Sequence, residues 1–146
     1  MARHTIAGLS SAAATATLPA VSLFAAAASQ GRIREIGIFN STVTAFVASL
    51  RKFSTVGTPG AGLTEIAWDG TSNPPLCTGF DAHSVAPTLV AGVLRHAQIS
   101  ANIGGGIIWT FGDSGLVIPP GTGNGFGILC PSGTGQILSY YFDWDE

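Results

Sequence analysis

Residues 136–144 read QILSYYFDW, and this stretch decides the fold of the 146-residue chain. Large apolar residues stand at every second position: Leu138, Tyr140, Phe142 and Trp144. The residues between them include Ser139 and Asp143. Side chains two residues apart lie on the same face of a β-strand, so one face of this segment is large and apolar. The segment therefore predicts a strand with one face buried in a core and the other turned outward.

Shorter segments of the same kind recur along the rest of the chain. Twenty glycines and eight prolines interrupt the sequence too often for helices, which leaves strands separated by turns. The further expected strands cover residues 4–9, 14–24, 32–39, 42–53, 88–100, 107–111, 116–118 and 125–130, with a short strand or turn at 63–68. A slip in the alternation near Glu35 predicts a β-bulge. About eight to ten short strands predict an all-β fold, a single-domain jelly roll or two-sheet β-sandwich with long loops over residues 1–146.

Charged residues are scarce in this chain. They make up 10% of the sequence, against about 25% in a typical soluble domain, while apolar residues reach 46%. We therefore expect other copies of the chain to cover part of the surface, because exposed apolar patches usually mark interfaces. The alternative is a surface of Ser, Thr, Gly and Asn that is simply neutral.

The distribution of the few charges argues against nucleic acid as a partner. The net charge is −2, and the basic clusters are limited to Arg32 with Arg34 and Arg51 with Lys52. These are too few to neutralise a long track of phosphates. The acidic end, residues 143–146, is interpreted as a solvated terminus.

The first 30 residues carry no formal charge between Arg3 and Arg32. Neither a signal peptide at the start nor a membrane span from Ser11 to Ser29 is expected. The run consists largely of Ala, Thr and Ser, and Pro19 lies in its middle. We expect residues 1–30 to form extended strands or an N-terminal arm, with no membrane partner.

Two Gly- and Pro-rich loops, at 57–62 and 71–75, are long for a compact domain and are therefore candidates for function. In an assembly protein, that function is contact with a neighbour. Trp68, beside Asp69 and Gly70, is the best candidate for such a contact. The candidate interface residues are Trp68, Leu63, Pro74, Pro75, Leu76, Phe80, Arg32 and Arg34.

The stretch from Phe111 to Leu116, FGDSGL, is the most enzyme-like in the sequence. It resembles the G-D-S-G around the nucleophile of chymotrypsin-like proteases and the G-D-S-L of a lipase family. A nucleophilic serine needs a histidine base and an orienting acid. No acid separates the central histidines from Asp113, no histidine follows His96, and His4 is expected to be a poor buried base. We predict instead a hairpin turn in which Gly115 takes a positive φ.

Metal and nucleotide sites are not expected either. Asp81 and His83, with His96 later, fall short of the three or four convergent ligands that a metal needs. The glycine-rich segments 121–127 and 131–135 lack the lysine and the helix signal of a phosphate loop, and are interpreted as hairpin connections. We therefore expect no catalytic, cofactor or metal site, and we do not expect an enzyme.

Two features leave alternatives open. Cys77 and Cys130 are interpreted as two partly buried thiols, while a disulfide between them depends on a distance that the sequence does not contain. Trp68, Tyr140 and Tyr141 could stack on sugars, so a receptor- or glycan-binding β-sandwich is an alternative function.

Several stretches together resemble a family of small virion proteins of tailed bacteriophages. They are MARHTIAGL at the start, REIGIFNST from Arg34, TVGTPGAGLTE from Thr55, IWTFGDSGLVIPPGTGNG from Ile108, and the final GTGQILSYYFDWDE. The likeness spans most of the chain. It implies a capsid decoration (cement) protein with a jelly-roll fold, often trimeric, and it brings no catalytic residues.

The resemblance also implies where the chain works. A homotrimer on the outer surface of the capsid, assembled in the host cytoplasm, would bridge neighbouring copies of the phage major capsid protein. Added contact area would resist the outward pressure of packaged DNA. A tail, neck or fibre component of the same virion is the closest alternative.

Overall fold

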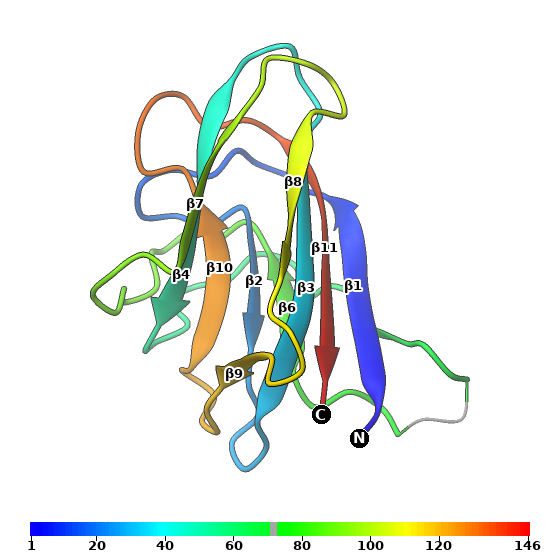
Figure 1. Ribbon diagram of the computed structural model, residues 1–146. Helices are drawn as coiled ribbons and strands as arrows, with labels where there is room; N and C mark the ends of the chain where they lie inside the picture. The colour runs from blue at the N-terminus through cyan, green and yellow to red at the C-terminus, as the bar shows by residue number, and fades with distance from the viewer. Residues whose placement is uncertain (71–72) are drawn as a thin grey trace.

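A computed structural model describes residues 1–70 and 73–146, and this part of the chain contains eleven strands (Figure 1). The strands are β1 (Arg3–Leu9), β2 (Val21–Phe24), β3 (Gly31–Asn40), β4 (Phe46–Phe53), β5 (Ile66–Ala67), β6 (Thr78–Asp81), β7 (Arg95–Ile99), β8 (Gly106–Thr110), β9 (Leu116–Ile118), β10 (Gly125–Leu129) and β11 (Leu138–Asp145). The described ranges contain no helix, which confirms the all-β prediction. In particular, they hold no helix long and apolar enough to cross a membrane.

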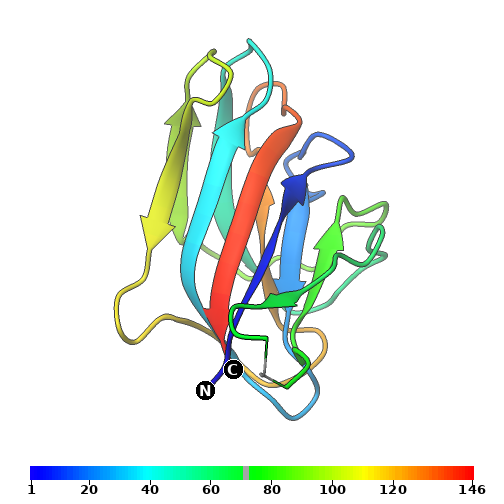
Figure 2. The same cartoon turned by 90° about the vertical axis from the view of Figure 1, so that its right-hand side faces the viewer.

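The strands form two antiparallel sheets that pack face to face (Figures 1 and 2). The first, called the β11 sheet, has the order β5-β1-β11-β3-β8, and β9 also pairs with β3. The second, called the β10 sheet, has the order β6-β2-β10-β4-β7. In Figure 2 the β11 sheet faces the viewer, with β8, β3, β11 and β1 next to one another.

The order of pairing makes this sandwich a jelly roll. β1 pairs with β11, β2 with β10, β3 with β8 and β4 with β7, so the first half of the chain pairs with the second half in reverse order. Rolling up this ribbon brings β11 beside β3 and β10 beside β4. Strands that cross in this way from one sheet to the other give the predicted jelly-roll architecture.

β11 lies at the centre of its sheet, between β1 and β3. The apolar residues at its alternate positions are all buried in the core: Leu138, Tyr140, Phe142 and Trp144. The β10 sheet covers them from the other side with Val21, Leu23, Leu50, Phe126 and Ile128. One strand therefore supplies much of the core.

The bulge predicted near Glu35 is confirmed. Asp143 of β11 pairs with Glu35, whereas the next residue, Trp144, pairs with Ile33, so Arg34 is the extra residue of β3. The bulge keeps both Ile33 and Ile36 in the core. It also leaves Arg34 outside the ladder, where its side chain can reach groups on the outer face of the sheet.

A long insertion, residues 54–94, separates β4 from β7 and contributes to both sheets. It adds β5 beside β1 and β6 beside β2. It also builds a second apolar cluster of Phe24, Phe53 and Leu129 with Val56, Phe80 and Leu89. Because Leu23 faces the main core, its neighbour Phe24 faces the opposite side of the β10 sheet, and the insertion covers it there. The predicted long loops are thus a third partial layer.

Several boundaries differ from the sequence-based expectation. Of the segment 14–24 only Val21–Phe24 is a strand, residues 42–45 and 88–94 lie outside strands, and β6 was not expected. Residues 71 and 72 of the predicted 71–75 loop lie outside the described residues. β1 and β2 each have a strand on either side, so the start of the chain belongs to the sandwich and is not a free arm.

The predicted hairpins are wrong, although the turns themselves are present. Gly115 has a φ of +64° as expected, but the turn before it joins β8 to β9, which both run along the same edge of β3. Segments 121–127 and 131–135 lie where the chain crosses between sheets. Turn residues mark a change of direction, but they do not say in which sheet the next strand lies.

Candidate functional site

The acidic end of the chain is not a solvated terminus, which corrects the sequence-based interpretation. The Asp145 residue is only 7% exposed. Its Oδ1 accepts a hydrogen bond from Arg3 Nε at 3.0 Å and its Oδ2 from Arg34 Nε at 2.5 Å. Burial by itself would raise the pKa of this carboxyl, but the two guanidinium groups outweigh burial and hold the pKa below its usual value.

Arg34 also ties the turn after β8 to the outer face of the β11 sheet. Its Nη1 donates to the carbonyl of Gly112 at 3.0 Å and to the carbonyl of Asp113. The turn within the FGDSGL motif, which resembles the surroundings of a serine nucleophile, is therefore held through its backbone by an arginine. The bulge of β3 provides the freedom for this contact, since it releases Arg34 from the regular ladder.

Trp68 is held in place although it is 62% exposed. It follows β5 directly, and its backbone N–H donates to the carbonyl of Arg3 at 2.9 Å. The Arg3 guanidinium lies 5.7 Å from the centre of the Trp68 ring. Burial raises the pKa of Asp143, opposed by the hydrogen bonds that Thr5 and Trp68 donate.

Tyr141 lies flat across the outer face of the same sheet. A Cβ atom at Gly37 would overlap the Tyr141 ring, so the ring occupies the space that this glycine leaves. The ring stacks on Phe39, with the ring centres 6.4 Å apart, and its hydroxyl donates to Glu35 Oε1 at 2.5 Å. Burial and the neighbouring Glu35 carboxylate raise the pKa of Tyr141.

These groups surround a cavity of about 330 Å³ on the outer face of the β11 sheet, called the Trp68 cavity. It is lined by Arg3, Arg34, Glu35, Trp68, Thr110, Gly112, Asp113 and Asp143. It thus combines one exposed aromatic ring with hydrogen-bond donors and acceptors supplied by strands that are far apart in the sequence.

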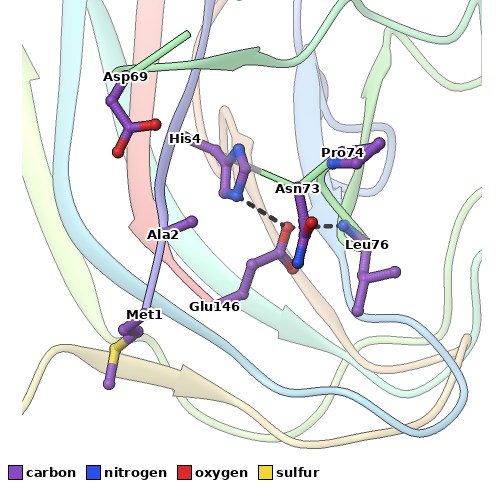
Figure 3. A pocket seen from close by; sticks show the side chains of 8 residues that line it. All are labelled: Met1, Ala2, His4, Asp69, Asn73, Pro74, Leu76 and Glu146. Atoms are coloured by element: carbon purple, nitrogen blue, oxygen red, sulfur yellow. Dashed lines mark hydrogen bonds and ion pairs between the residues drawn. The ribbon is translucent and has the colours of Figure 1, made fainter. Parts of the chain in front are cut away.

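A larger cavity, of about 740 Å³, lies where the two ends of the chain meet residues 73–76 (Figure 3). Glu146 is at its centre, with a side chain that is 5% exposed. Oε1 accepts the backbone N–H of Leu76 at 2.6 Å, and Oε2 accepts that of Cys77 at 2.9 Å. His4 Nε2 lies 3.5 Å from Oε1, so a buried imidazole and a buried carboxylate form a pair.

Glu146 acts as a structural clamp, meaning that it holds a segment of the insertion against the ends of two strands. Both carboxylate oxygens accept backbone N–H groups, which fixes residues 76 and 77 against the ends of β1 and β11. Burial, and then Glu146, raise the pKa of the nearby Cys77 thiol, which keeps it protonated at neutral pH and makes it a weak nucleophile. His4, which was expected to be a poor buried base because it lies so near the start, is itself buried, at 1% exposure.

The candidate interface residues divide between surface and interior. Trp68, Pro74 and Leu76 are exposed, and Pro75, Arg32 and Arg34 are half-buried. Leu63 packs against the main core and Phe80 against the second cluster. Of the residues considered for sugar stacking, Trp68 and Tyr141 lie on the outer face of the β11 sheet, while Tyr140 is buried in the core, where burial raises its pKa to about 12.

The residues considered for metal binding do not converge. His83 is buried, and its Nε2 lies 2.7 Å from Ser22 Oγ beside the second cluster. His96 is exposed on β7, at the far edge of the β10 sheet from β6. Within the ranges 1–70 and 73–146, no group of three His, Cys, Asp or Glu side chains is placed to hold a metal ion. Cys77 and Cys130 are both buried and free.

Large apolar side chains are exposed at both edges of the sandwich. At the edge that the insertion forms with β5 and β6, they are Ile66 and Leu76. At the edge formed by β7 and β8, they are Val93, Leu94, Ile103 and Ile108. These edges lie at opposite ends of the strand order in both sheets.

Sequence reasoning missed His4, Asp143, Asp145 and Glu146 as members of organised sites. A signal for Asp143 was present, because the alternation of β11 places it on the outward face together with Tyr141. The partners on β1 and β5 carried no such signal, since they come from the other end of the chain and from the insertion. Comparison with protein-family models, with curated proteins and with solved structures yields no match for this chain.

Proposed function

We propose that the chain is a structural protein of a tailed-bacteriophage particle, a capsid decoration protein that binds the outside of the head as a homotrimer and bridges major capsid proteins. The observation that carries the proposal is a jelly roll with large apolar side chains exposed at two opposite edges. The low content of charged residues, 10%, supports it, because such edges are poorly solvated in a free subunit. The resemblance to small virion proteins supports the location.

The two apolar edges favour a ring of subunits over a two-fold dimer. A two-fold contact buries the same patch on both copies and would leave the other edge bare. A head-to-tail contact joins two different patches, and it closes into a ring when the rotation is right. The insertion edge of one subunit against the β7–β8 edge of the next would cover both, provided each contact buries about 1,000 Å² or more.

The β8 edge strand also has the backbone for such a contact. β8 reads Gly-Ile-Ile-Trp-Thr and contains no charged residue, although its outer side has no partner strand in the described part of the chain. Charged residues and prolines usually protect an edge strand from pairing with other chains. An unprotected edge strand therefore fits a subunit that is covered in its working state.

Two matched variants test the ring with purified protein. The first, Ile66→Ser with Leu76→Ser, alters the insertion edge, and the second, Val93→Ser with Ile103→Ser, alters the β7–β8 edge. Sedimentation velocity should give a trimer for the parent chain and monomers for each variant alone. An equimolar mixture of the two variants should give dimers, because one intact edge of each kind remains to form a single contact.

Other outcomes of this experiment contradict the ring. A parent chain that stays monomeric at high concentration removes the basis for self-association. If one of the two variants assembles normally, the contact is two-fold and lies at the edge that this variant leaves unaltered. Circular dichroism before sedimentation confirms that the variants are folded.

The location requires a separate experiment on particles. Cryo-EM maps of phage heads with and without the protein should differ by density over the junctions between capsomers, on the outer surface. Density at the neck, tail or fibre would contradict the decoration role and support the alternative position in the virion. A particle map without this chain would refute a virion function.

A further inference from the structure

We propose that the Trp68 cavity is a binding site for neutral carbohydrate, with Trp68 as the stacking platform and the surrounding carboxylates and guanidinium groups as partners of the sugar hydroxyls. This inference does not depend on the virion function, because every group it needs belongs to a single subunit. The proposal gives a reason for the exposure of the Trp68 side chain, which the packing of the fold does not require.

The first argument is the state of Trp68. Of the three tryptophans, Trp109 and Trp144 are buried in the core, whereas Trp68 is 62% exposed. Exposed aromatic side chains usually move, but this one is held through its backbone N–H and through the guanidinium beside its ring. A rigid, exposed aromatic ring loses little conformational entropy on binding and can pack against the C–H face of a pyranose.

The second argument is the polar lining. Two guanidinium groups, three carboxylates and the Thr110 hydroxyl line one small cavity. Glu35 accepts one hydrogen bond from Tyr141, and a carboxylate has about four acceptor positions, so most of its capacity is open to a ligand. Arg34 uses its Nε and Nη1 within the protein, which leaves the N–H groups of Nη2. Neighbouring hydroxyls of a sugar both donate and accept, and therefore need such closely spaced donors and acceptors.

The charge of the lining narrows the class of ligand. The cavity carries three carboxylates against two guanidinium groups, and Asp145 adds another negative charge behind them. An anionic ligand such as a phosphate or a uronic acid would meet a net negative site, which disfavours it. An apolar ligand would bury these charged groups without partners, which is costly. A neutral, hydroxyl-rich ligand meets neither penalty.

The binding experiment uses maltohexaose, cellohexaose, xylohexaose and chitohexaose as neutral probes and polygalacturonate as the anionic probe. Because the other tryptophans are buried, quenching of the intrinsic fluorescence by acrylamide reports mainly on Trp68. At least one neutral probe should protect Trp68 from acrylamide, with a Kd of about 0.1–1 mM, the weak range expected for a shallow site.

Variants then separate binding from a structural role, with calorimetry as the readout. Trp68→Ala should weaken binding at least about 10-fold, and Trp68→Phe should restore part of it, because a smaller ring remains as a platform. Glu35→Gln should weaken binding while its amide oxygen can still accept the Tyr141 hydroxyl. The control is Leu9→Ala, which alters an exposed residue at the other end of β1 and should bind like the parent chain.

Failure of this proposal is distinguishable from failure of the proposed function. The Val93→Ser/Ile103→Ser variant leaves the cavity unaltered, so it should bind the same sugar whether or not it assembles. No protection by any neutral probe at about 10 mM, protection by polygalacturonate only, or undiminished binding by Trp68→Ala would each overturn the sugar site. None of these results bears on the oligomeric state or on the location in a particle.

Discussion

Replacing Glu146 by glutamine tests how the ends of the chain are locked to the insertion. The carboxylate uses both oxygens, at 2.6 Å from Leu76 N and 2.9 Å from Cys77 N, in a position only 5% exposed. A glutamine presents one oxygen and one NH₂ group, so one backbone N–H would face another donor. A hydrogen bond to a charged group contributes about 1.5–3 kcal/mol, and losing it leaves a desolvated N–H.

We therefore expect Glu146→Gln to lower the free energy of unfolding by about 2–3 kcal/mol. For a chain of this length each kcal/mol corresponds to about 2–4 °C, so the melting temperature should fall by about 4–12 °C. Urea denaturation gives the free energy, and hydrogen exchange locates the change. The amides of Leu76 and Cys77 should exchange faster, whereas those of the central strands should follow only the global change.

Glu65→Gln is the matched control. Glu65 also receives a backbone N–H, that of Gly79, but through Oε1 alone at 2.8 Å. The single oxygen of a glutamine can replace that acceptor, so the expected change is below about 0.5 kcal/mol. Equal stabilities of the two variants, or unchanged exchange at residues 76 and 77, would refute the clamp.

Three further predictions concern charge and packing. Asp145→Asn should cost about 1–2 kcal/mol at neutral pH, a value reduced from that of a fully buried pair because Arg3 is half exposed. Since the folded pKa of Asp145 is lowered, its stabilisation is present above the unfolded value of about 3.9 and is lost as the pH falls through the folded pKa; urea midpoints of the variant should therefore decline less in acid. Burial lowers the pKa of His83 in the folded protein. The contribution of the neutral His83 to the free energy of unfolding is therefore fully present above the unfolded pKa of 6.5 and is lost as the pH falls below that value. His83→Gln should flatten the decrease in stability between about pH 6.5 and 5, and an unchanged slope would contradict a neutral buried imidazole. Gly37→Ala should cost about 1–3 kcal/mol because its Cβ meets the Tyr141 ring, while Gly62→Ala, where nothing lies within 4 Å, should cost less; thermal unfolding of both variants decides this.

Much of the fold could be predicted from local patterns. The alternation in residues 136–144 identified β11 and its buried face, because the side-chain period of a strand is a property of the backbone. The slip near Glu35 identified the bulge, and the glycine at position 115 identified a positive φ. The strand count was sufficient to predict a two-sheet sandwich or jelly roll, since so many short strands in one domain leave few other ways to bury their apolar faces.

The sequence by itself thus determined the strands, their buried faces and the absence of helical periodicity, because these depend on residues that are close along the chain. Only the tertiary structure decided which turns cross between sheets and that the insertion adds a strand to each. It also turned the acidic end from an apparent solvated terminus into two organised sites, around Asp145 and Glu146. Their partners, Arg3 and residues 76–77, are about 70 to 142 positions away in the sequence. Only the tertiary fold brings these groups together. Burial then strengthens the electrostatic interactions between them, and no local sequence pattern reveals this effect.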